Sequence, residues 1–291
     1  MGTYSLPCKS YYFQGYKPLR YLSDTKKCRI NNRFIYKYVT LDSLKSILSN
    51  GIRFSSLDSW PDKGESRFYN ADYRSIKPEF VRPRVFATCF TRNKQSEASW
   101  KGYIDLCKLY ENRKQWLSDN LEDSLTVAQL KINRTALKKE LSQYVRDNND
   151  SVLGIYEGEV CYVSSYALLN CHLPGIPGAQ SLHNALFEKG AFGIDDYLSV
   201  CLMKRMEIFE QEKEIRYFLV TKEIEKRAYT VKVNVRGVIE QMLLWKPFSS
   251  SIISEQECLL KAEEFGLDRE IVKPADIYMN NNDNPISIQT L

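Results

Sequence analysis

Histidine is nearly absent from this chain, which holds only two in 291 residues, His172 and His183. The eight cysteines are scattered and form no Cys-x-x-Cys pair, so no spacing typical of a zinc or iron–sulfur site is present. Scattered cysteines in a chain of this length without a signal peptide are expected to be reduced and mostly buried, and we expect no metal cofactor. Because so little histidine is available to activate a thiol, a catalytic cysteine is not expected.

The sequence also lacks glycine-rich phosphate-binding motifs. No Gly-x-Gly-x-x-Gly, Walker or Gly-x-Ser-x-Gly pattern occurs, which argues against Rossmann dehydrogenases, kinases, P-loop enzymes and α/β-hydrolases. Apolar runs such as residues 160–169 are shorter than the ~20 residues that span a bilayer, and no signal peptide is visible. We therefore expect a cytoplasmic protein with no membrane partner.

The charge that is present is distributed unevenly. Residues 1–40 hold eight Lys or Arg and one acid, residues 41–95 add a net charge of +4, and residues 96–291 sum to −6. A basic half can attract a polyanion or an anionic cofactor. Residues 1–33 are rich in tyrosine as well, and we expect a basic arm that either stacks on single-stranded bases or packs against the domain.

With 43% hydrophobic and 26% charged residues, the chain has the composition of a folded domain. The run at residues 34–39 is aromatic and β-branched and predicts a strand. Thr40 is expected to cap a helix that ends at Gly51. Further strands are expected at residues 52–55, 85–91, 152–156, 160–164, 214–220 and 229–235, and a helix at 253–265 that ends at Gly266.

The sequence predicts helices in three further places. Residues 105–150 are charged and carry two apolar stripes, which predicts a helical insertion. The first is Leu121, Leu125, Ala128 and Leu130, and the second is Leu137, Leu141, Tyr144 and Val145. Residues 202–210 and 181–189 are also expected to be helical. The sequence thus predicts one α+β domain over residues 34–278, followed by a polar tail at residues 279–291.

Two segments carry side chains suited to ligand binding. Tyr36, Tyr38 and Thr40 share one face of the first strand by its two-residue period, next to a helix N-terminus that favours an anion. Trp100 and Tyr103 share a helix face by their i, i+3 spacing, which can enclose a flat ring. A half-buried sheet face and an ordinary apolar core are the alternative interpretations of these patterns.

A third segment, at the start of the strand over residues 214–220, holds two acids. Glu212 and Glu214 point the same way from a strand, and paired carboxylates can divide the work of stabilising positive charge and activating a nucleophile. A charged strand edge that protects the sheet from aggregation is the alternative.

Together these segments resemble an uncharacterised bacterial domain family whose members often lie near phage-defence loci. The similarity covers about residues 34–278, although Trp60-Pro61-Asp62 replaces the usual Asn-Asp-Pro. It is carried by residues 34–55, Asp62, Glu65, Cys89-Phe90-Thr91, Trp100-Lys101-Gly102-Tyr103, Lys204 and Glu212-x-Glu214-x-Arg216.

More distantly, the chain resembles the ADP-ribosyltransferase superfamily, which has three motifs in the same order. The opening segment looks like that of DarT-like members, with Tyr38 where they have histidine. This resemblance implies an ADP-ribosyltransferase-like split mixed or antiparallel sheet with flanking helices. It also implies transfer of ADP-ribose from NAD to a macromolecule, nucleic acid rather than protein.

The resemblance assigns roles to individual residues as well. Glu214 would stabilise an oxocarbenium-like ribose and Glu212 would orient or deprotonate the acceptor. The expected NAD-binding residues are Tyr38, Thr40 and Ser55 at the ribose and the nicotinamide amide, Thr91 in the second motif, Trp100 and Tyr103 around the nicotinamide, and Lys204 or Arg53 at the pyrophosphate.

The same resemblance predicts a toxin or phage-defence effector with an antitoxin or a defence-system partner protein. Three alternatives stay open. The chain can be a non-catalytic module that senses a nucleotide or partner, a NAD glycohydrolase with water as acceptor, or a nucleic-acid binder driven by its basic arm.

Overall fold

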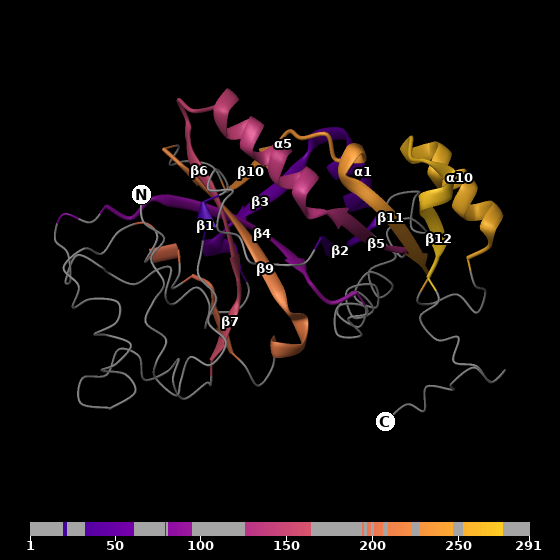
Figure 1. Cartoon of the computed structure of the whole chain (residues 1–291), viewed down its shortest axis with the longest axis horizontal. Coiled ribbons are helices and arrows are strands. Elements are labelled where there is room, and N and C mark those ends of the chain that lie inside the picture. Colours follow the sequence, from indigo (N-terminus) through magenta and orange to yellow (C-terminus); the bar gives the residue numbers. More distant parts are fainter. Residues whose placement is uncertain are drawn as a thin grey trace, which may run out of the picture.

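The computed structural model describes residues 20–21, 33–60, 79, 81–94, 126–163, 194, 197–198, 201–205, 209–222, 227–246 and 253–275. These residues form an α+β fold in which a few helices pack on a large mixed sheet of mostly antiparallel strands (Figure 1). No helix in these ranges is long and apolar enough to cross a membrane.

The large sheet has ten strands, eight of them on one continuous path. In spatial order these are β1 (Arg20–Tyr21), β6 (Val152–Glu159), β9 (Glu214–Thr221), β4 (Arg84–Thr91), β2 (Phe34–Thr40), β5 (Val127–Asn133), β11 (Ile239–Trp245) and β12 (Val272–Pro274). Neighbours on this path are antiparallel except β11 and β12, which are parallel.

One edge of β4 divides between two partners. Thr91, at the end of β4, pairs with Tyr36 of β2, whereas Ala87 and Phe86 pair with β3 (Ile52–Ser56), which in turn pairs with β10 (Ala228–Val231). The strands β2 and β4 therefore separate from the Tyr36–Thr91 pair towards the start of β4, and we call this opening the seam. The Lys37 ammonium crosses it and donates to the carbonyl oxygen of Cys89 at 2.9 Å and to Thr88 Oγ1 at 3.2 Å.

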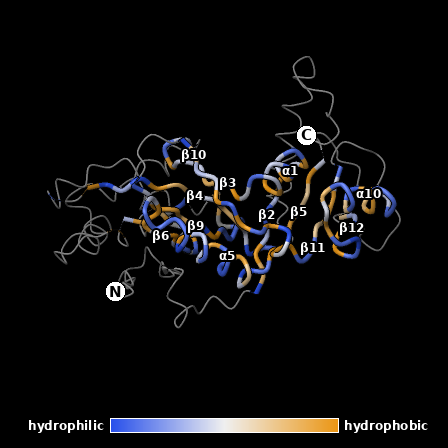
Figure 2. The backbone as a smooth tube through the Cα atoms, turned by 90° about the horizontal axis from the view of Figure 1, so that it is seen from above, coloured by the Kyte–Doolittle hydropathy of each residue, from blue (hydrophilic) through white to orange (hydrophobic). Residues whose placement is uncertain are grey.

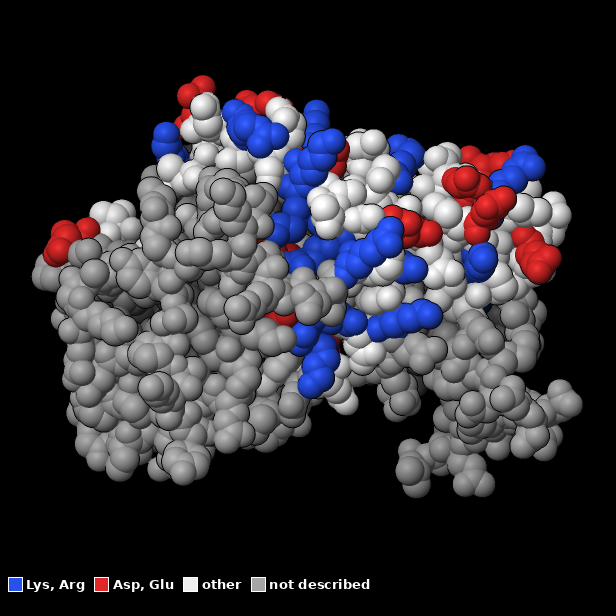
Figure 3. All heavy atoms as spheres, viewed as in Figure 1, with Lys and Arg blue, Asp and Glu red and all other residues white. Residues whose placement is uncertain are grey.

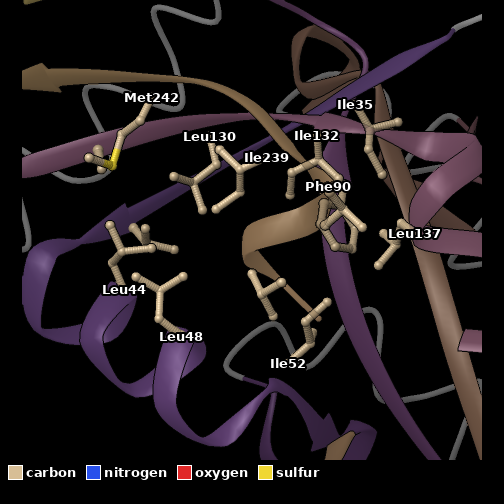
Figure 4. Close-up of a cluster of buried hydrophobic side chains, with 14 of the residues drawn as sticks. Ile35, Leu44, Leu48, Ile52, Phe90, Leu130, Ile132, Leu137, Ile239 and Met242 are labelled. Carbon is tan, nitrogen blue, oxygen red and sulfur yellow. The ribbon is translucent and has the colours of Figure 1, made fainter. Parts of the chain in front are cut away.

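In the described part of the chain, three helices cover one face of the sheet, and their apolar sides contribute to the main core (Figure 4). Helix α1 (Leu41–Asn50) begins at Thr40, whose hydroxyl accepts a hydrogen bond from Ser43 N, and buries Leu41, Leu44 and Leu48. Figure 4 shows Leu44 and Leu48 pointing towards side chains of the sheet. Figure 2 shows hydrophobic and hydrophilic residues alternating along these elements, as an amphipathic fold requires.

Helix α5 (Arg134–Asp147) is joined to the sheet by charge as well as by Leu137 and Leu141. Arg134, at its first turn, donates from Nε and from an Nη to the two oxygens of Glu157 on β6, at 2.6 and 2.5 Å. Tyr217 of β9 donates to the same carboxylate at 2.5 Å. Burial raises the pKa of Glu157, but the Arg134 hydrogen bond and charge outweigh burial and lower it.

Helix α10 (Glu255–Phe265) has both of its ends specified by local sequence. Ser254 and Glu257 form a capping box, and Gly266 ends the helix in the left-handed conformation. The other face of the sheet carries a second core, with Leu57 of η1 (Leu57–Ser59) and Val85, Ala87, Phe218 and Val220 of the strands. A separate parallel pair, β7 (Cys161–Val163) and β8 (Met203–Arg205), completes the described strands.

The structure confirms the strands expected near residues 34–39, 52–55, 85–91 and 214–220, and the helices that end at Gly51 and Gly266. The helical interpretation of Ala128 and Leu130 is wrong, because β5 occupies residues 127–133 between β2 and β11. Ala128, Leu130 and Ile132 alternate with Gln129 and Lys131, which is a strand period.

One smaller expectation is also corrected. Met203–Arg205 is a strand inside the segment 202–210 that was expected to be helical, because its backbone pairs with that of β7. Arg20 and Tyr21, in the segment expected to be an arm, form β1 and pair with β6, which agrees with packing of this part against the domain. The expected helix at 181–189, residues 105–125 of the insertion and the tail at 279–291 lie outside the described residues.

Replacement of Gly51 by alanine should destabilise the fold strongly. Gly51 has φ 103° and ψ −173°, a conformation open only to glycine, and an added Cβ would lie 2.2 Å from the Val231 carbonyl oxygen. We expect a loss above about 3 kcal/mol in the free energy of unfolding, measured with a chemical denaturant.

Gly266→Ala is the matched control, since Gly266 has φ 61° and its added Cβ meets only Arg236 Nε at 3.5 Å. Its expected cost is about 1–2 kcal/mol. Equal losses in the two variants would contradict the contact between Gly51 and β10.

Candidate functional site

Polar side chains line up across the sheet next to the point where the seam begins. Glu214 of β9 lies opposite Thr91 of β4, Thr91 lies opposite Tyr36 of β2, and Tyr36 lies opposite Lys131 of β5. Directly opposed residues of antiparallel strands project to the same face, so these four side chains share the face that carries the second core. The candidate site is built around Glu214.

The Glu214 carboxylate is buried and bound by two cations. Arg216 Nε lies 2.8 Å from one carboxylate oxygen, and Lys204 Nζ lies 3.0 Å from the other. The side chains of Glu214 and Arg216 are only 6% and 1% exposed. Burial raises the pKa of Glu214, but the charges of Arg216 and Lys204 outweigh burial and lower it to about 2. Glu214 is therefore ionised at any physiological pH.

Lys204 joins this buried acid to a more accessible one. Its ammonium lies 2.7 Å from Glu212 and 3.0 Å from Glu214, with the ring of Phe209 4.3 Å away. The Glu212 side chain is 32% exposed, against 6% for Glu214. The cluster of two acids and two bases has no net charge. Of the two carboxylates, Glu212 is the one that a ligand can reach.

A tight turn positions Glu212 relative to Glu214. The short helix η4 (Glu210–Glu212) leads into β9 through Lys213, which has φ 45° and so lies in the left-handed region. The end of β4 holds this turn, because the Thr91 hydroxyl donates to the Glu212 carbonyl and Arg92 N donates to the Lys213 carbonyl. A non-glycine residue in this region marks local strain that the neighbouring strand stabilises.

Aromatic and sulfur-containing side chains enclose the buried part of the cluster. The Arg216 guanidinium lies 4.4 Å from the centre of the Trp60 ring and donates to the Cys201 carbonyl. Glu214 N donates to the hydroxyl of Tyr162 at 2.8 Å. Burial raises the pKa of the Cys89 thiol, with the Glu214 charge adding to the effect, so Cys89 is not a thiolate nucleophile here.

Four of the residues predicted from sequence meet at this site. They are Thr91, Lys204, Glu212 and Glu214. Tyr38 lies on the same face, two residues along β2 from Tyr36, where it is 6% exposed and accepts a hydrogen bond from Gln129 at 2.6 Å.

The other predicted ligands lie elsewhere or outside the described part of the chain. Thr40 caps α1 and lies four residues along β2 from Tyr36. Ser55 pairs with Ala87, which lies four residues along β4 from Thr91. Each is therefore about 13 Å from the Tyr36–Thr91 pair, measured along these strands. Arg53 is exposed on β3, opposite Thr230. Trp100 and Tyr103 lie outside the described residues.

Several residues that shape the site were missing from the sequence-based list. Arg216 carried a signal, since a lone arginine in an otherwise apolar strand requires a buried anion. Trp60, Tyr162 and Phe209 come from separate segments and had no signal of this kind. No group of three His, Cys, Asp or Glu in the described ranges is arranged to hold a metal ion.

Comparison of the sequence with protein-family models and with curated proteins finds no match.

Replacing Glu214 by glutamine should destabilise the protein, because Arg216 and Lys204 would stay buried without their anion. We expect a loss of about 3–5 kcal/mol in the free energy of unfolding by denaturant. Glu212→Gln removes one partner of the same lysine at a more exposed position and should cost less than about 1 kcal/mol. A Glu214→Gln variant as stable as the wild type would show that the cluster does not support the fold.

The stabilising effect of Glu214 should depend on pH. Its pKa is about 2 in the folded protein against an ordinary value of 4.5, so protonation favours the unfolded chain. The contribution is therefore complete above about pH 5 and is lost as the pH falls towards 2. The difference in unfolding free energy between wild type and Glu214→Gln should shrink over this interval; a constant difference would contradict the ion pairs.

Proposed function

We propose that this protein is a NAD-dependent ADP-ribosyltransferase that modifies a macromolecule. The observation that supports this most is the adjacency of β2, β4 and β9, which carry the three segments of the resemblance. Residues 36, 91 and 214 are far apart in the sequence, yet they form consecutive cross-strand pairs. The division of the β4 edge at the seam is in keeping with a split sheet.

The reaction breaks the bond between the ribose C1′ and the nicotinamide nitrogen of NAD, and nicotinamide leaves as a neutral molecule. A nucleophilic atom of the acceptor forms the new bond to C1′ and gives up its proton. Positive charge develops on the ribose in the transition state, where a nearby carboxylate stabilises it. A base beside the acceptor takes the proton.

Burial distinguishes the two acids in this scheme. Glu212 is accessible and is our candidate for contact with the acceptor, which matches the role that the resemblance assigns to it. Glu214 is neutralised by Arg216 and Lys204. Glu214 can stabilise an oxocarbenium-like ribose only when Lys204 moves away from it towards Glu212. If Lys204 stays in place, the role of Glu214 is to position Lys204. A toxin or defence effector is the biological role that fits this chemistry.

A second candidate function is a non-catalytic module that binds a nucleotide or a partner. The saturation of Glu214 by two cations favours it, because a fully paired carboxylate resembles a structural ion pair more than a reactive group. A NAD glycohydrolase would use the same site with water as the acceptor.

Glu212→Gln should abolish ADP-ribose transfer while leaving the fold intact. We would incubate the full-length protein with labelled NAD and cell extract, then measure label on nucleic acid and on protein after separate protease and nuclease digestion. Loss of a general base lowers such rates by about 10²–10⁴-fold, so the variant should retain at most 1% of the activity, by this estimate.

Glu270→Gln is the matched control, since Glu270 is exposed and lies in η6 (Arg269–Ile271), outside the site. It should transfer ADP-ribose at the wild-type rate. Free ADP-ribose without labelled macromolecule would select the glycohydrolase. If the wild-type protein does not consume NAD, the non-catalytic binding module is the candidate function that remains.

A further inference from the structure

Basic side chains gather at one end of the sheet, beside Glu212. Arg33 precedes β2, Arg92 follows β4 and Lys213 precedes β9, and because these strands are antiparallel their three ends lie together. Figure 3 shows Lys and Arg side chains running as a band across the middle of one face of the molecule.

The basic side chains at this end of the sheet form the set that we call the basic band, and a shared ring and backbone hydrogen bonds link several of them. Lys131 and Arg33 both lie over the Phe34 ring, at 4.1 and 5.1 Å from its centre. Arg33 meets the start of α5, since its carbonyl accepts from Arg134 N. Arg92 and Lys213 are joined by a backbone hydrogen bond. The band consists of Arg33, Arg92, Lys131, Lys138 and Lys213.

Two acids that pair with band residues lie beneath the surface. Glu157 and Glu159 are 1% and 3% exposed. Glu157 is bound by Arg134 and Lys138, and Glu159 is bound by Arg92. Their charges hold Lys138 and Arg92 in position from inside, whereas the five cations of the band are exposed or half-buried. These five cations outnumber two accessible acids next to them, Glu212 and Glu240.

We propose that the basic band binds the phosphodiester backbone of a nucleic acid and delivers it to Glu212. The band crosses four strands, about 14 Å, which suits a chain of phosphates better than a single anion. Arg33 lies on Phe34 and is exposed, so its outer plane is available to a base. Residues 1–32, which lead into Arg33, add six Lys or Arg and one acid.

Delivery of an acceptor to Glu212 depends on the proposed transferase function, but binding itself does not. Lys213 is adjacent to Glu212 in sequence, and Arg92 holds the same turn. A nucleic acid on the band therefore passes next to the accessible carboxylate. This geometry names nucleic acid as the acceptor class of the site.

The test is binding of a labelled single-stranded oligonucleotide of about 16 nucleotides to the full-length protein, by fluorescence anisotropy without NAD. The variant Lys131→Gln/Lys138→Gln/Lys213→Gln removes three charges of the band. We expect its Kd to rise at least about tenfold, and the slope of log K against log salt to flatten by about 2.

The control Lys222→Gln/Lys232→Gln/Lys273→Gln removes three charges from exposed lysines in other parts of the described surface. It should bind within about twofold of the wild type, since it changes the net charge equally but touches no band residue. Unfolding by denaturant should show both triple variants to be folded.

The proposal would be overturned if the two triple variants weakened oligonucleotide binding equally. It would also be overturned if the wild-type protein bound polyglutamate as tightly as the oligonucleotide, or did not bind the oligonucleotide at all. Normal oligonucleotide binding without NAD consumption would overturn the transferase alone, and transfer of ADP-ribose to protein without oligonucleotide binding would overturn the band alone.

Discussion

The burial of opposite charges on β9 is the constraint on which the rest of the structure depends. All eight residues of this strand are buried, yet it carries Glu214 and Arg216 on one face, and Tyr217 bound to the Glu157 carboxylate on the other. A buried charge is tolerated only when it is paired and hydrogen-bonded. The register of β9 against β6 is thus supported by the hydrogen bond from Tyr217 to Glu157 as well as by apolar packing.

These pairs connect elements that share no backbone hydrogen bonds with β9. Arg134 ties α5 to Glu157, and Lys204 ties the separate β7–β8 pair to Glu212 and Glu214. The two faces of the strand have different consequences. The Glu157 side closes a core beneath α5, whereas the Glu214 side ends in an accessible acid next to the seam and the basic band.

The local chemistry of the sequence accounts for many of the elements. Local signals act within a few residues, so they can be predicted from the sequence without knowledge of the fold. They are the N-cap at Thr40, the glycines that end the helices and the β-branched runs of the strands. The segment around Ala128 and Leu130 fits both a helical and a strand period, and only pairing with β2 and β11 makes it a strand. The same limit applies to Met203–Arg205, whose partner β7 lies about 40 residues earlier.

The candidate site divides in the same way. The sequence alone determined that Glu214 and Arg216 lie on one side of a strand, because a strand has a period of two. The expectation that Glu212 shares this strand is wrong, because Glu212 ends η4 and the turn at Lys213 sets its position relative to Glu214. Only the tertiary structure decided that Glu214 is enclosed by Arg216 and Lys204 while Glu212 stays accessible. Spacing along the chain fixes the direction in which a side chain points. Burial and ion pairing depend on residues that approach from β4, β7 and β8, and these contacts arise only when the chain has folded.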